Sequence, residues 1–492
     1  MNFKSTRGTG TSVSAAQAIK QGLADDGGLY VPESLPVLTD ADFTELCLQT
    51  YAERAAKILG MFLSDYTEEE LLRDCEEVYC EDAFPGGAAP LVSLRSGFEM
   101  LELWHGPTAA FKDMALQIMP RLLSRALLKT GEDRTALILV ATSGDTGKAA
   151  LEGYRDVPRV KIAVFYPVDG VSRVQKLQMA TQLGSNVGIY AIRGNFDDAQ
   201  SSVKAIFGDA EMTRKLDEKG YFLSSANSIN WGRLAPQIVY YISAYCDLVN
   251  SGKIKMGEAI NICVPTGNFG NIFAAYLAKR MGLPVARLIC ASNSNNVLTD
   301  FLETGTYDRN RPFHLTMSPS MDILISSNLE RLLYFTAGSK RTAEYMAALR
   351  ETGTYTVDAD VLQAIRESFV GYYASEEETA ETIRRTLDKD GYLADPHTAV
   401  AITAAEKYRA ETGDGTPIVI ASTASPFKFA NNVYRAVTGT EPSGDLEALD
   451  ELAAKTGTAI PYPLAGLSTR EIRFQTVCDC NDMPDLVLHF AE

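Results

Sequence analysis

Six short apolar runs recur along the chain, and each is followed by a stretch with helical periodicity. Continuous apolar runs of this length are typical of parallel strands, whose two faces are both covered by helices. Glycine-rich turns follow several of them and lead into the next helix. The sequence therefore predicts an α/β fold with strands over residues 136–141, 161–166, 187–192, 259–264, 286–291 and 417–421.

The first ninety residues have a different texture. Residues 14–23 form a helical candidate, and Thr67 to Glu70 has the spacing of a capping box ahead of another helix. We expect a mainly helical N-terminal domain. Later, the acidic stretch from Ser375 predicts a helix start on a solvated face.

The charge of the chain narrows the class of protein. The 492 residues include 46 Lys and Arg against 63 Asp and Glu, a net charge of -17. Such a charge repels nucleic acid and anionic membranes. No apolar run approaches the roughly 18 residues of a membrane span, and residues 1–7 lack the apolar stretch of a signal peptide. We expect a cytoplasmic small-molecule enzyme with no nucleic-acid or membrane partner.

Metal chemistry is not expected. The four histidines are widely separated, and the eight cysteines show no repeated C-x-x-C spacing. The cysteines are predicted to be reduced thiols.

The segment from Leu103 to Asp113 joins a Gly-Pro turn to Lys112, just before the apolar helix predicted over residues 114–123. Burial and the positive end of a helix both favour the neutral amine, which is the form that attacks an aldehyde. Lys112 is therefore a candidate imine-forming lysine. The alternative is a surface lysine in the first turn of a helix.

The segment from Thr142 to Lys148 follows a predicted strand and opens a helix, so backbone N–H groups, hydroxyls and Lys148 can converge on an anion. It is not a Walker A motif, because Ala149 follows Lys148 where that motif has Ser or Thr. The alternative is a tight turn between a strand and a helix.

Two further segments end predicted strands. Residues 264–271, with glycines at 267 and 270, can wrap closely around one phosphate, although they lack the G-x-G-x-x-G spacing of a dinucleotide site. Residues 422–428 place hydroxyls at the end of the last strand, and a hydroxyl can hydrogen-bond a pyridine nitrogen. Together with Lys112, these are the parts that hold pyridoxal phosphate.

The order and wording of these segments resemble the fold-type II pyridoxal-phosphate enzymes, and threonine synthases in particular. The strings that carry the resemblance are WHGPTAAFKD at 104–113, ATSGDTG at 141–147, PTGNFGN at 265–271, STR at 5–7, GLADDGGLYVP at 22–32, NSINWGR at 227–233, SPSMD at 318–322 and DPHT at 395–398. The match extends to about residue 430. It implies a fold like that of the tryptophan synthase β subunit, with two open parallel-sheet domains and a mainly helical N-terminal domain.

The resemblance also implies a domain division. We expect the N-terminal domain over 1–90, the large cofactor-binding domain over 91–135 and 226–440, the small domain over 136–225, and a segment over 441–492 that packs on the body of the protein.

The implied cofactor is pyridoxal 5'-phosphate, with Lys112 as its Schiff-base lysine and as the catalytic base. By position, Gly267, Asn268, Phe269, Gly270 and Asn271 hold the cofactor phosphate, and Thr423, with Ser422 as second choice, faces the pyridine nitrogen. The substrate is assigned to Thr142, Ser143, Gly144, Asp145, Thr146, Lys148, Asn230 and Arg233.

Three of the charged residues have open roles. Asp145 is given no contact with the cofactor ring, because a carboxylate there is repelled by the phenolate oxygen unless it is protonated or turned away. Arg233 and Lys428 are, together with Lys148, candidate partners of a substrate phosphate, and the alternative for Arg233 and Lys428 is an ordinary ion pair on a helix.

The implied reaction converts O-phospho-L-homoserine and water to L-threonine and phosphate, in a monomer or a homodimer. Two alternatives stay open. A phospholyase releases 2-oxobutyrate, ammonia and phosphate from a similar substrate, and an inactive relative acts only as a binding protein.

Overall fold

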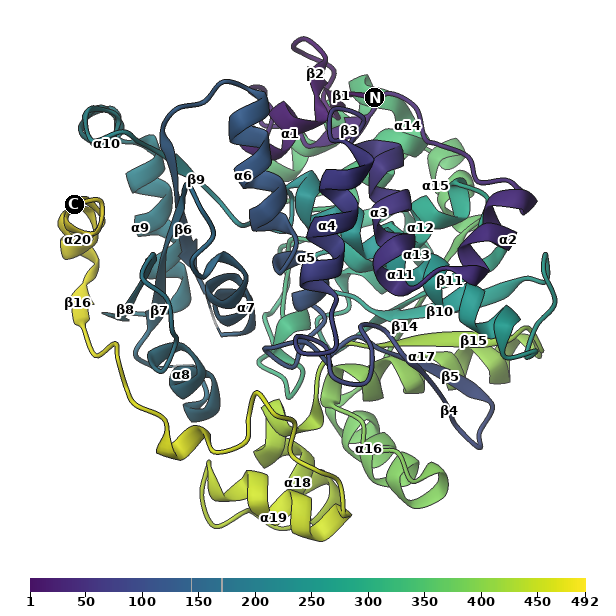
Figure 1. Cartoon of the computed structure of the whole chain (residues 1–492). Coiled ribbons are helices and arrows are strands. Elements are labelled where there is room, and N and C mark those ends of the chain that lie inside the picture. Colours follow the sequence, from purple (N-terminus) through teal and green to yellow (C-terminus); the bar gives the residue numbers. More distant parts are fainter. Residues whose placement is uncertain (143, 170) are drawn as a thin grey trace.

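Two separate sheets organise the computed structural model, which describes residues 1–142, 144–169 and 171–492 (Figure 1). The larger sheet has the order β14-β11-β10-β15-β5-β4, and only the edge strand β4 runs antiparallel to its neighbour. Its strands are β4 (Leu91–Ser93), β5 (Phe98–Glu102), β10 (Ile260–Pro265), β11 (Val285–Ser292), β14 (Phe369–Tyr373) and β15 (Ile418–Ser422).

The smaller sheet is parallel throughout, in the order β16-β8-β7-β6-β9. Its strands are β6 (Thr135–Ala141), β7 (Val160–Pro167), β8 (Val187–Arg193), β9 (Tyr221–Ser224) and β16 (Val477–Asp479). All six predicted strands are thus confirmed. The other strands of the two sheets, β4, β5, β9, β14 and β16, were not predicted, because they are short and carry charged, glycine or half-exposed positions.

Helices cover both faces of each sheet, as continuous apolar strands require. In the larger sheet, Ile262 and Val264 belong to one core and Cys263, between them, to another, because side chains alternate across a strand. The surrounding helices are α5 (Asp113–Leu116), α6 (Met119–Lys129), α11 (Trp231–Asn250), α12 (Gly270–Arg280), α13 (Val297–Thr304), α14 (Leu329–Thr352), α15 (Ala359–Arg366), α16 (Glu376–Asp390) and α17 (Pro396–Thr412). Ser375 caps α16, as predicted.

The smaller sheet carries α7 (Asp145–Tyr154) and α8 (Arg173–Ala180) on one face. The other face carries α9 (Phe196–Gly208), α10 (Ala210–Glu218) and α20 (Met483–Phe490). Glycine lets α7 approach α5 closely, since a Cβ at Gly153 would lie 1.9 Å from the Leu116 carbonyl oxygen.

The N-terminal region is helical with a small antiparallel sheet. The strands are β1 (Asn2–Ser5), β2 (Val13–Ser14) and β3 (Tyr30–Pro32), and the helices are α1 (Ala15–Gln21), α2 (Asp40–Leu48), α3 (Tyr51–Phe62) and α4 (Glu68–Val78). The capping box at Thr67 is confirmed. Phe3 and Phe62 pack edge-on against Trp231 of α11, which joins this region to the body.

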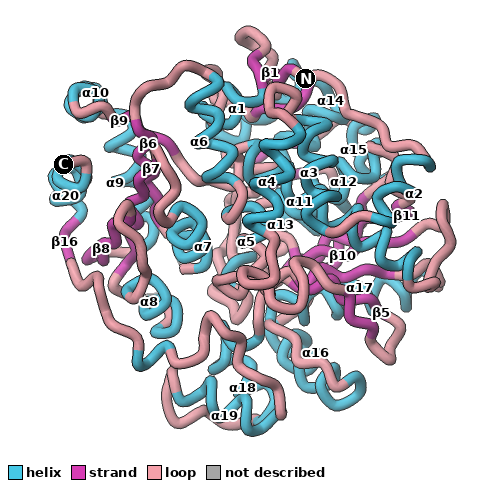
Figure 2. Tube along the Cα trace, viewed as in Figure 1, coloured by secondary structure: helices cyan, strands magenta, loops and turns pink. Residues whose placement is uncertain are grey.

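The C-terminal segment connects the two sheets. After α18 (Ala430–Thr438) and α19 (Glu447–Thr456), the chain runs mostly as loop along one side of the molecule to β16 and α20 beside the smaller sheet (Figures 1 and 2). β16 then adds a parallel strand next to β8. The remaining short elements are β12 (Thr306–Asp308), β13 (Thr354–Thr356), η1 (Pro319–Met321), η2 (Pro426–Phe429), η3 (Leu467–Thr469) and η4 (Cys480–Asp482).

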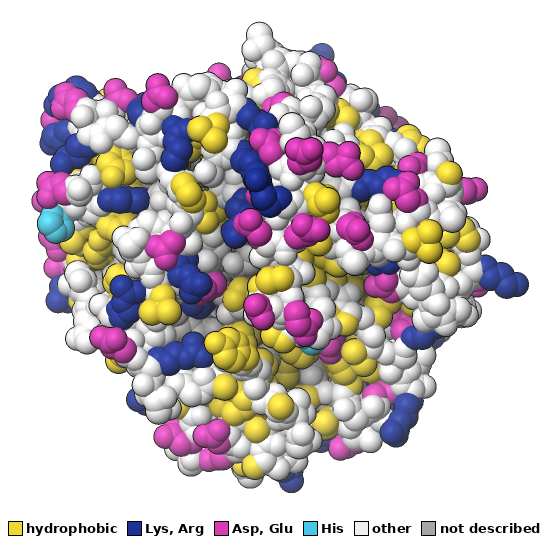
Figure 3. Space-filling model, in the orientation of Figure 1, with side chains coloured by type: hydrophobic (Ala, Val, Ile, Leu, Met, Phe, Trp, Pro, Cys, Tyr) yellow, Lys and Arg dark blue, Asp and Glu magenta, His cyan; other side chains and the backbone are white. Residues whose placement is uncertain are grey.

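The surface of the molecule carries charges of both signs: acidic and basic side chains are interspersed over the face drawn in Figure 3. Within the described ranges, no helix combines the length and the apolar character that crossing a bilayer demands.

Candidate active site

Lys112 lies at the start of α5, between the two sheets. Its Nζ atom is 3.4 Å from the Ser320 hydroxyl and 3.9 Å from Oδ2 of Asp145. The side chain is only 12% exposed, so the surface-lysine alternative is wrong. Burial lowers the pKa of Lys112; the charge of Asp145 opposes this, and the charges of Lys428 and Arg233 add to it. The environment therefore favours a neutral amine at the position that the sequence singled out.

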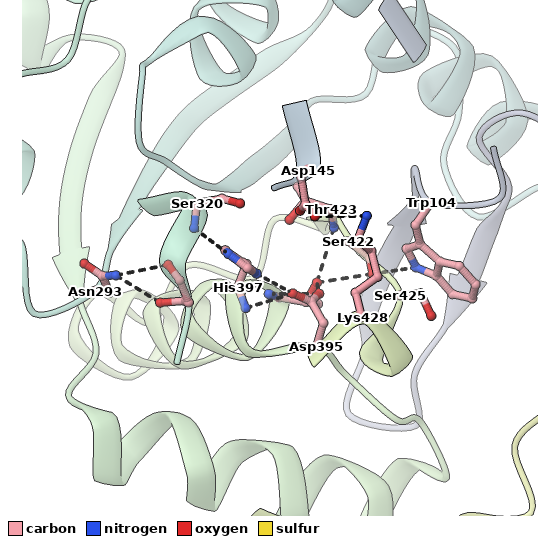
Figure 4. A network of polar contacts seen from close by, with 12 residues as sticks. Trp104, Asp145, Asn293, Ser320, Asp395, His397, Ser422, Thr423, Ser425 and Lys428 are labelled. Atoms are coloured by element: carbon pink, nitrogen blue, oxygen red, sulfur yellow. Dashed lines mark hydrogen bonds and ion pairs between the residues drawn. The ribbon is translucent and has the colours of Figure 1, made fainter. Parts of the chain in front are cut away.

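Asp145 begins α7 and faces Lys112 from the smaller sheet. Its Oδ1 atom lies 2.9 Å from Nζ of Lys428 and accepts a hydrogen bond of 2.9 Å from Gln175 of α8. Burial alone would raise the pKa of Asp145, but the charges of Lys428 and Lys112 hold it well below its ordinary value. Figure 4 shows Asp145 and Lys428 pointing toward one another from different parts of the chain.

The turn before Lys112 is held from two sides. Lys428, fully buried in η2, donates to the Thr108 carbonyl at 2.8 Å. Thr108 in turn donates through its backbone N–H and its hydroxyl to Asp113, at 2.8 and 2.7 Å. Burial raises the pKa of Asp113 to about 6. Lys428 thus forms an ion pair, as its alternative role had it, but the pair is buried and links separate elements of the protein.

His397 fixes the backbone of Ser320 by a hydrogen bond. Its Nε2 atom accepts a hydrogen bond from the Ser320 backbone N–H, so its proton is on Nδ1, which donates to Asp395 at 2.7 Å. Asp395 is itself the N-cap of α17. The strings at 318–322 and 395–398 contribute to the family resemblance, but no role of Ser320 or His397 was predicted from them.

The loop over residues 267–271 has the geometry of an anion cradle. The Gly267 carbonyl accepts from the Ser326 hydroxyl, and the Asn268 carbonyl accepts from the backbone and side chain of Asn328. The backbone N–H groups of this loop donate to no described residue. They lie at the start of α12, where the helix dipole also favours an anion.

Three features of this loop depend on its residue types. Phe269 has φ 61°, a conformation that a non-glycine residue rarely adopts. A Cβ at Gly267 would lie 2.8 Å from the carbonyl oxygen of Ser320, the residue that contacts Lys112. Asn271 accepts from the hydroxyls of Tyr240 and Tyr241, while its buried Nδ2 has no partner in the described part of the chain.

The 142–147 loop turns tightly into α7. The Thr142 hydroxyl oxygen accepts from the N–H groups of Gly144 and Gly147, so it caps the helix. Gly144 has φ 140°, and a Cβ there would lie 2.5 Å from Gln175, so both its backbone and its surroundings require glycine. Thr146 is partly exposed, and Ser143 lies outside the described residues.

The two hydroxyls after β15 differ in their surroundings. Ser422 is bonded to Trp104, Tyr392 and Thr398. Thr423 is buried, its backbone is fixed by Thr398 and Phe111, and its hydroxyl bonds to no residue that the structure describes. Thr423 is therefore the better of the two candidates for a ring nitrogen.

Three further residues were expected to bind substrate: Lys148, Asn230 and Arg233. The structure does not bring all three to the site around Lys112. Arg233 is buried, and its charge lowers the pKa of Lys112. Its Nε has no partner among the described residues. In contrast, Lys148 is paired with Glu152 at 3.1 Å, and Asn230 caps α11 and donates to the Ile19 carbonyl. Burial lowers the pKa of Arg233 to about 10, and no described carboxylate forms an ion pair with it.

These residues fit pyridoxal phosphate. A buried lysine with a lowered pKa can form the imine, unpaired N–H groups in the 267–271 loop can hold the phosphate, and the Thr423 hydroxyl is available for the ring nitrogen. The Nδ2 atom of Asn271, which is buried and has no partner among the described residues, indicates that a polar ligand group belongs at this loop.

Comparison with known proteins gives three matching family models. The model for pyridoxal-phosphate dependent enzymes matches residues 87–424. The models for the threonine synthase N terminus and C-terminal region match residues 2–79 and 398–487.

Individual relatives agree with these models. Threonine synthase of Pseudomonas aeruginosa is 40% identical over 479 residues, which cover 96% of this chain and 95% of that protein. The human protein threonine synthase-like 1 is 41% identical over 434 residues, which cover 86% of this chain but only 58% of the longer human protein. The crystal structure of threonine synthase with bound pyridoxal phosphate from Brucella melitensis superposes with a TM-score of 0.89 and 38% identity, covering 100% of both chains. This chain therefore belongs to the threonine synthase family of pyridoxal-phosphate-dependent enzymes.

Proposed function

We propose that this chain converts O-phospho-L-homoserine and water to L-threonine and phosphate, with pyridoxal phosphate bound at Lys112. The observation that carries the proposal is the position of Ser320, whose hydroxyl contacts Lys112 and whose carbonyl packs against Gly267 of the anion cradle. Ser320 thus contacts both the lysine that would bind the cofactor aldehyde and the loop that would bind the cofactor phosphate.

Each residue then has a defined task. The 267–271 loop binds the cofactor phosphate, and Thr423 orients the pyridine ring. Lys112 holds the cofactor and moves the proton at Cα of the substrate. When bound, pyridoxal phosphate withdraws electrons from the substrate so that protons at Cα and Cβ can leave.

Arg233 supports a phosphorylated substrate in particular. Its buried guanidinium group lacks an acidic partner among the described residues, so a phosphate would supply the missing charge. Phosphate departs from Cγ and water adds at Cβ. The 142–147 loop, with Asp145 and Gln175, closes the other side of the site.

The test is product analysis with the cofactor-loaded protein and O-phospho-L-homoserine. Equal yields of phosphate and threonine are expected, and Lys112→Ala abolishes both. Lys407→Ala, which removes a lysine paired with Glu378 away from this site, serves as the control and keeps wild-type yields. Phosphate accompanied by 2-oxobutyrate and ammonia would instead identify a phospholyase, and an inert wild type would identify a binding protein.

A further inference from the structure

Lys428 and Asp145 form a buried ion pair next to the candidate cofactor lysine. The Lys428 side chain is 0% exposed and that of Asp145 5% exposed, and their charged atoms lie 2.9 Å apart. A buried pair of this kind loses much of its attraction to desolvation, and an apolar pair of similar size is often at least as stabilising. Stability is therefore a weak reason for the pair, and its geometry points to a role in the site.

The two oxygens of Asp145 have different surroundings. Lys428 and Gln175 both engage Oδ1, whereas Oδ2 faces Nζ of Lys112 at 3.9 Å, beyond hydrogen-bonding distance. Without Lys428, the Gln175 amide would be the only group among the described residues that holds the carboxylate. Lys112 would then be the nearest cation, and Asp145 would turn toward it.

The same ammonium group holds the turn that carries Lys112. Lys428 donates to the Thr108 carbonyl, and Thr108 donates twice to Asp113, the residue after Lys112. One side chain thus connects η2, the 104–112 segment and the first residue of α7.

We propose that Lys428 is a positioning residue: by holding the Asp145 carboxylate and the Thr108 carbonyl, it keeps Asp145 from pairing closely with Lys112 and so keeps the Lys112 amine available for reaction. This inference rests on the proposed role of Lys112 as the cofactor lysine. It assigns Lys428 a function other than binding substrate phosphate.

The charges that face Lys112 agree with this assignment in sign. Asp145 on α7 and Asp113 on α5 raise the pKa of Lys112, while Lys428 on η2 and Arg233 on α11 lower it. A close pair with Asp145 would favour the protonated ammonium group, which does not attack an aldehyde. Removing Lys428 removes a repelling cation and also frees the opposing carboxylate.

The experiment uses the full chain and measures how fast the cofactor-free protein forms its visible band with pyridoxal phosphate as a function of pH. Lys428→Met is expected to move the midpoint of this pH profile upward by about one pH unit, with an about tenfold slower reaction at neutral pH. Asp145→Asn is expected to move the midpoint downward. Lys279→Met, which removes a half-buried lysine that donates to the Ala286 carbonyl elsewhere, keeps the wild-type midpoint.

The double variant Asp145→Asn with Lys428→Met separates positioning from charge alone. If Lys428 acts through Asp145, its removal moves the midpoint clearly less in the Asp145→Asn background than in the wild-type background. Equal shifts of the midpoint in the two backgrounds would mean that Lys428 acts on Lys112 only through its charge, and would overturn the proposal.

Two further outcomes are decisive. If Lys428→Met does not fold, Asp145→Asn alone decides, because a midpoint at or above that of the wild type overturns the proposal. A wild type without a visible band overturns the assignment of Lys112 itself, whereas a normal band with unmoved midpoints overturns only the role of Lys428.

Discussion

Nε2 of His397 accepts a hydrogen bond of 3.1 Å from the backbone N–H of Ser320, and the hydroxyl of the same serine lies 3.4 Å from Nζ of Lys112. His397 itself does not contact Lys112. It fixes the backbone of Ser320, and Ser320 contacts Lys112. Asp395 orients the histidine ring through Nδ1, so the relay begins at the N-cap of α17.

Replacing His397 therefore tests this relay. His397→Leu removes the acceptor of the half-buried Ser320 N–H and the donor to the buried Asp395, at a cost of about 1–3 kcal/mol. We expect turnover to fall by about tenfold or more in steady-state assays. His397→Gln can present an oxygen near the Nε2 position and should keep more activity than His397→Leu. Equal activity of the two variants would contradict the relay.

Asp113 predicts a pH dependence of stability. Burial raises its pKa from the ordinary value of 3.8 to about 6, so the folded state holds this proton more tightly than the unfolded state does. Its contribution is present in full below pH 3.8 and is lost as the pH rises through about 6, a loss of about 3 kcal/mol. Asp113→Asn lacks this loss, so its free energy of unfolding should improve relative to the wild type between pH 4 and pH 7. Denaturant unfolding of the cofactor-free proteins at several pH values measures this difference, and parallel pH curves would refute it.

Arg233 predicts a large effect on binding and a small one on stability. Arg233→Met removes a buried charge that has no acidic partner in the described chain and a single hydrogen bond, to the Ala226 carbonyl, so the melting temperature should stay nearly the same. The KM for O-phospho-L-homoserine should rise by about tenfold or more, because a charged hydrogen bond to phosphate contributes about 1.5–3 kcal/mol.

The matched control for Arg233 is Arg331, a second buried arginine. Its Nε and one terminal nitrogen donate to the carbonyls of Tyr30 and Ile229. Arg331→Met should therefore lower the melting temperature. If Arg233→Met behaves in the same way and leaves KM unchanged, Arg233 is a structural residue.

The C-terminal segment predicts a stability effect far from the active site. Met483 of α20 is fully buried in the core over the smaller sheet. Met483→Ala should cost about 2–5 kcal/mol of unfolding free energy, measured by chemical denaturation. Val477 of β16 is 45% exposed, so Val477→Ala should cost far less. Similar costs for the two variants would show that α20 does not complete this core.

Some parts of the site were predictable because their cause is local in sequence. Lys112, the 142–147 loop, the 267–271 loop and Thr423 each follow an apolar strand or begin a helix, and the order of strand, turn and helix is visible in the residue types. The six long apolar strands were found for the same reason. The short strands β5 and β14 were missed because their few residues mix charged, glycine and aromatic side chains.

Other parts have no local signal. Nothing around Gln175 indicates that it donates to Asp145, and the string at 318–322 does not show that Ser320 meets Lys112. These partners are decided by which helices and loops pack together. Lys148, expected to face an anion, is instead paired with Glu152 one turn later in α7, and the i,i+4 spacing of these two residues is a local signal for that pair.

The α/β class, the candidate lysine and the two loops follow from the order of the residues alone, since turn chemistry and side-chain periodicity act over a few neighbouring residues. Three features depend on the packed fold: Asp145 pairs with Lys428, Arg233 is buried without an acidic partner in the described chain, and β16 extends the smaller sheet. Burial and charge pairing depend on distances between residues remote in the sequence, and these distances exist only after the two sheets and their helices have packed.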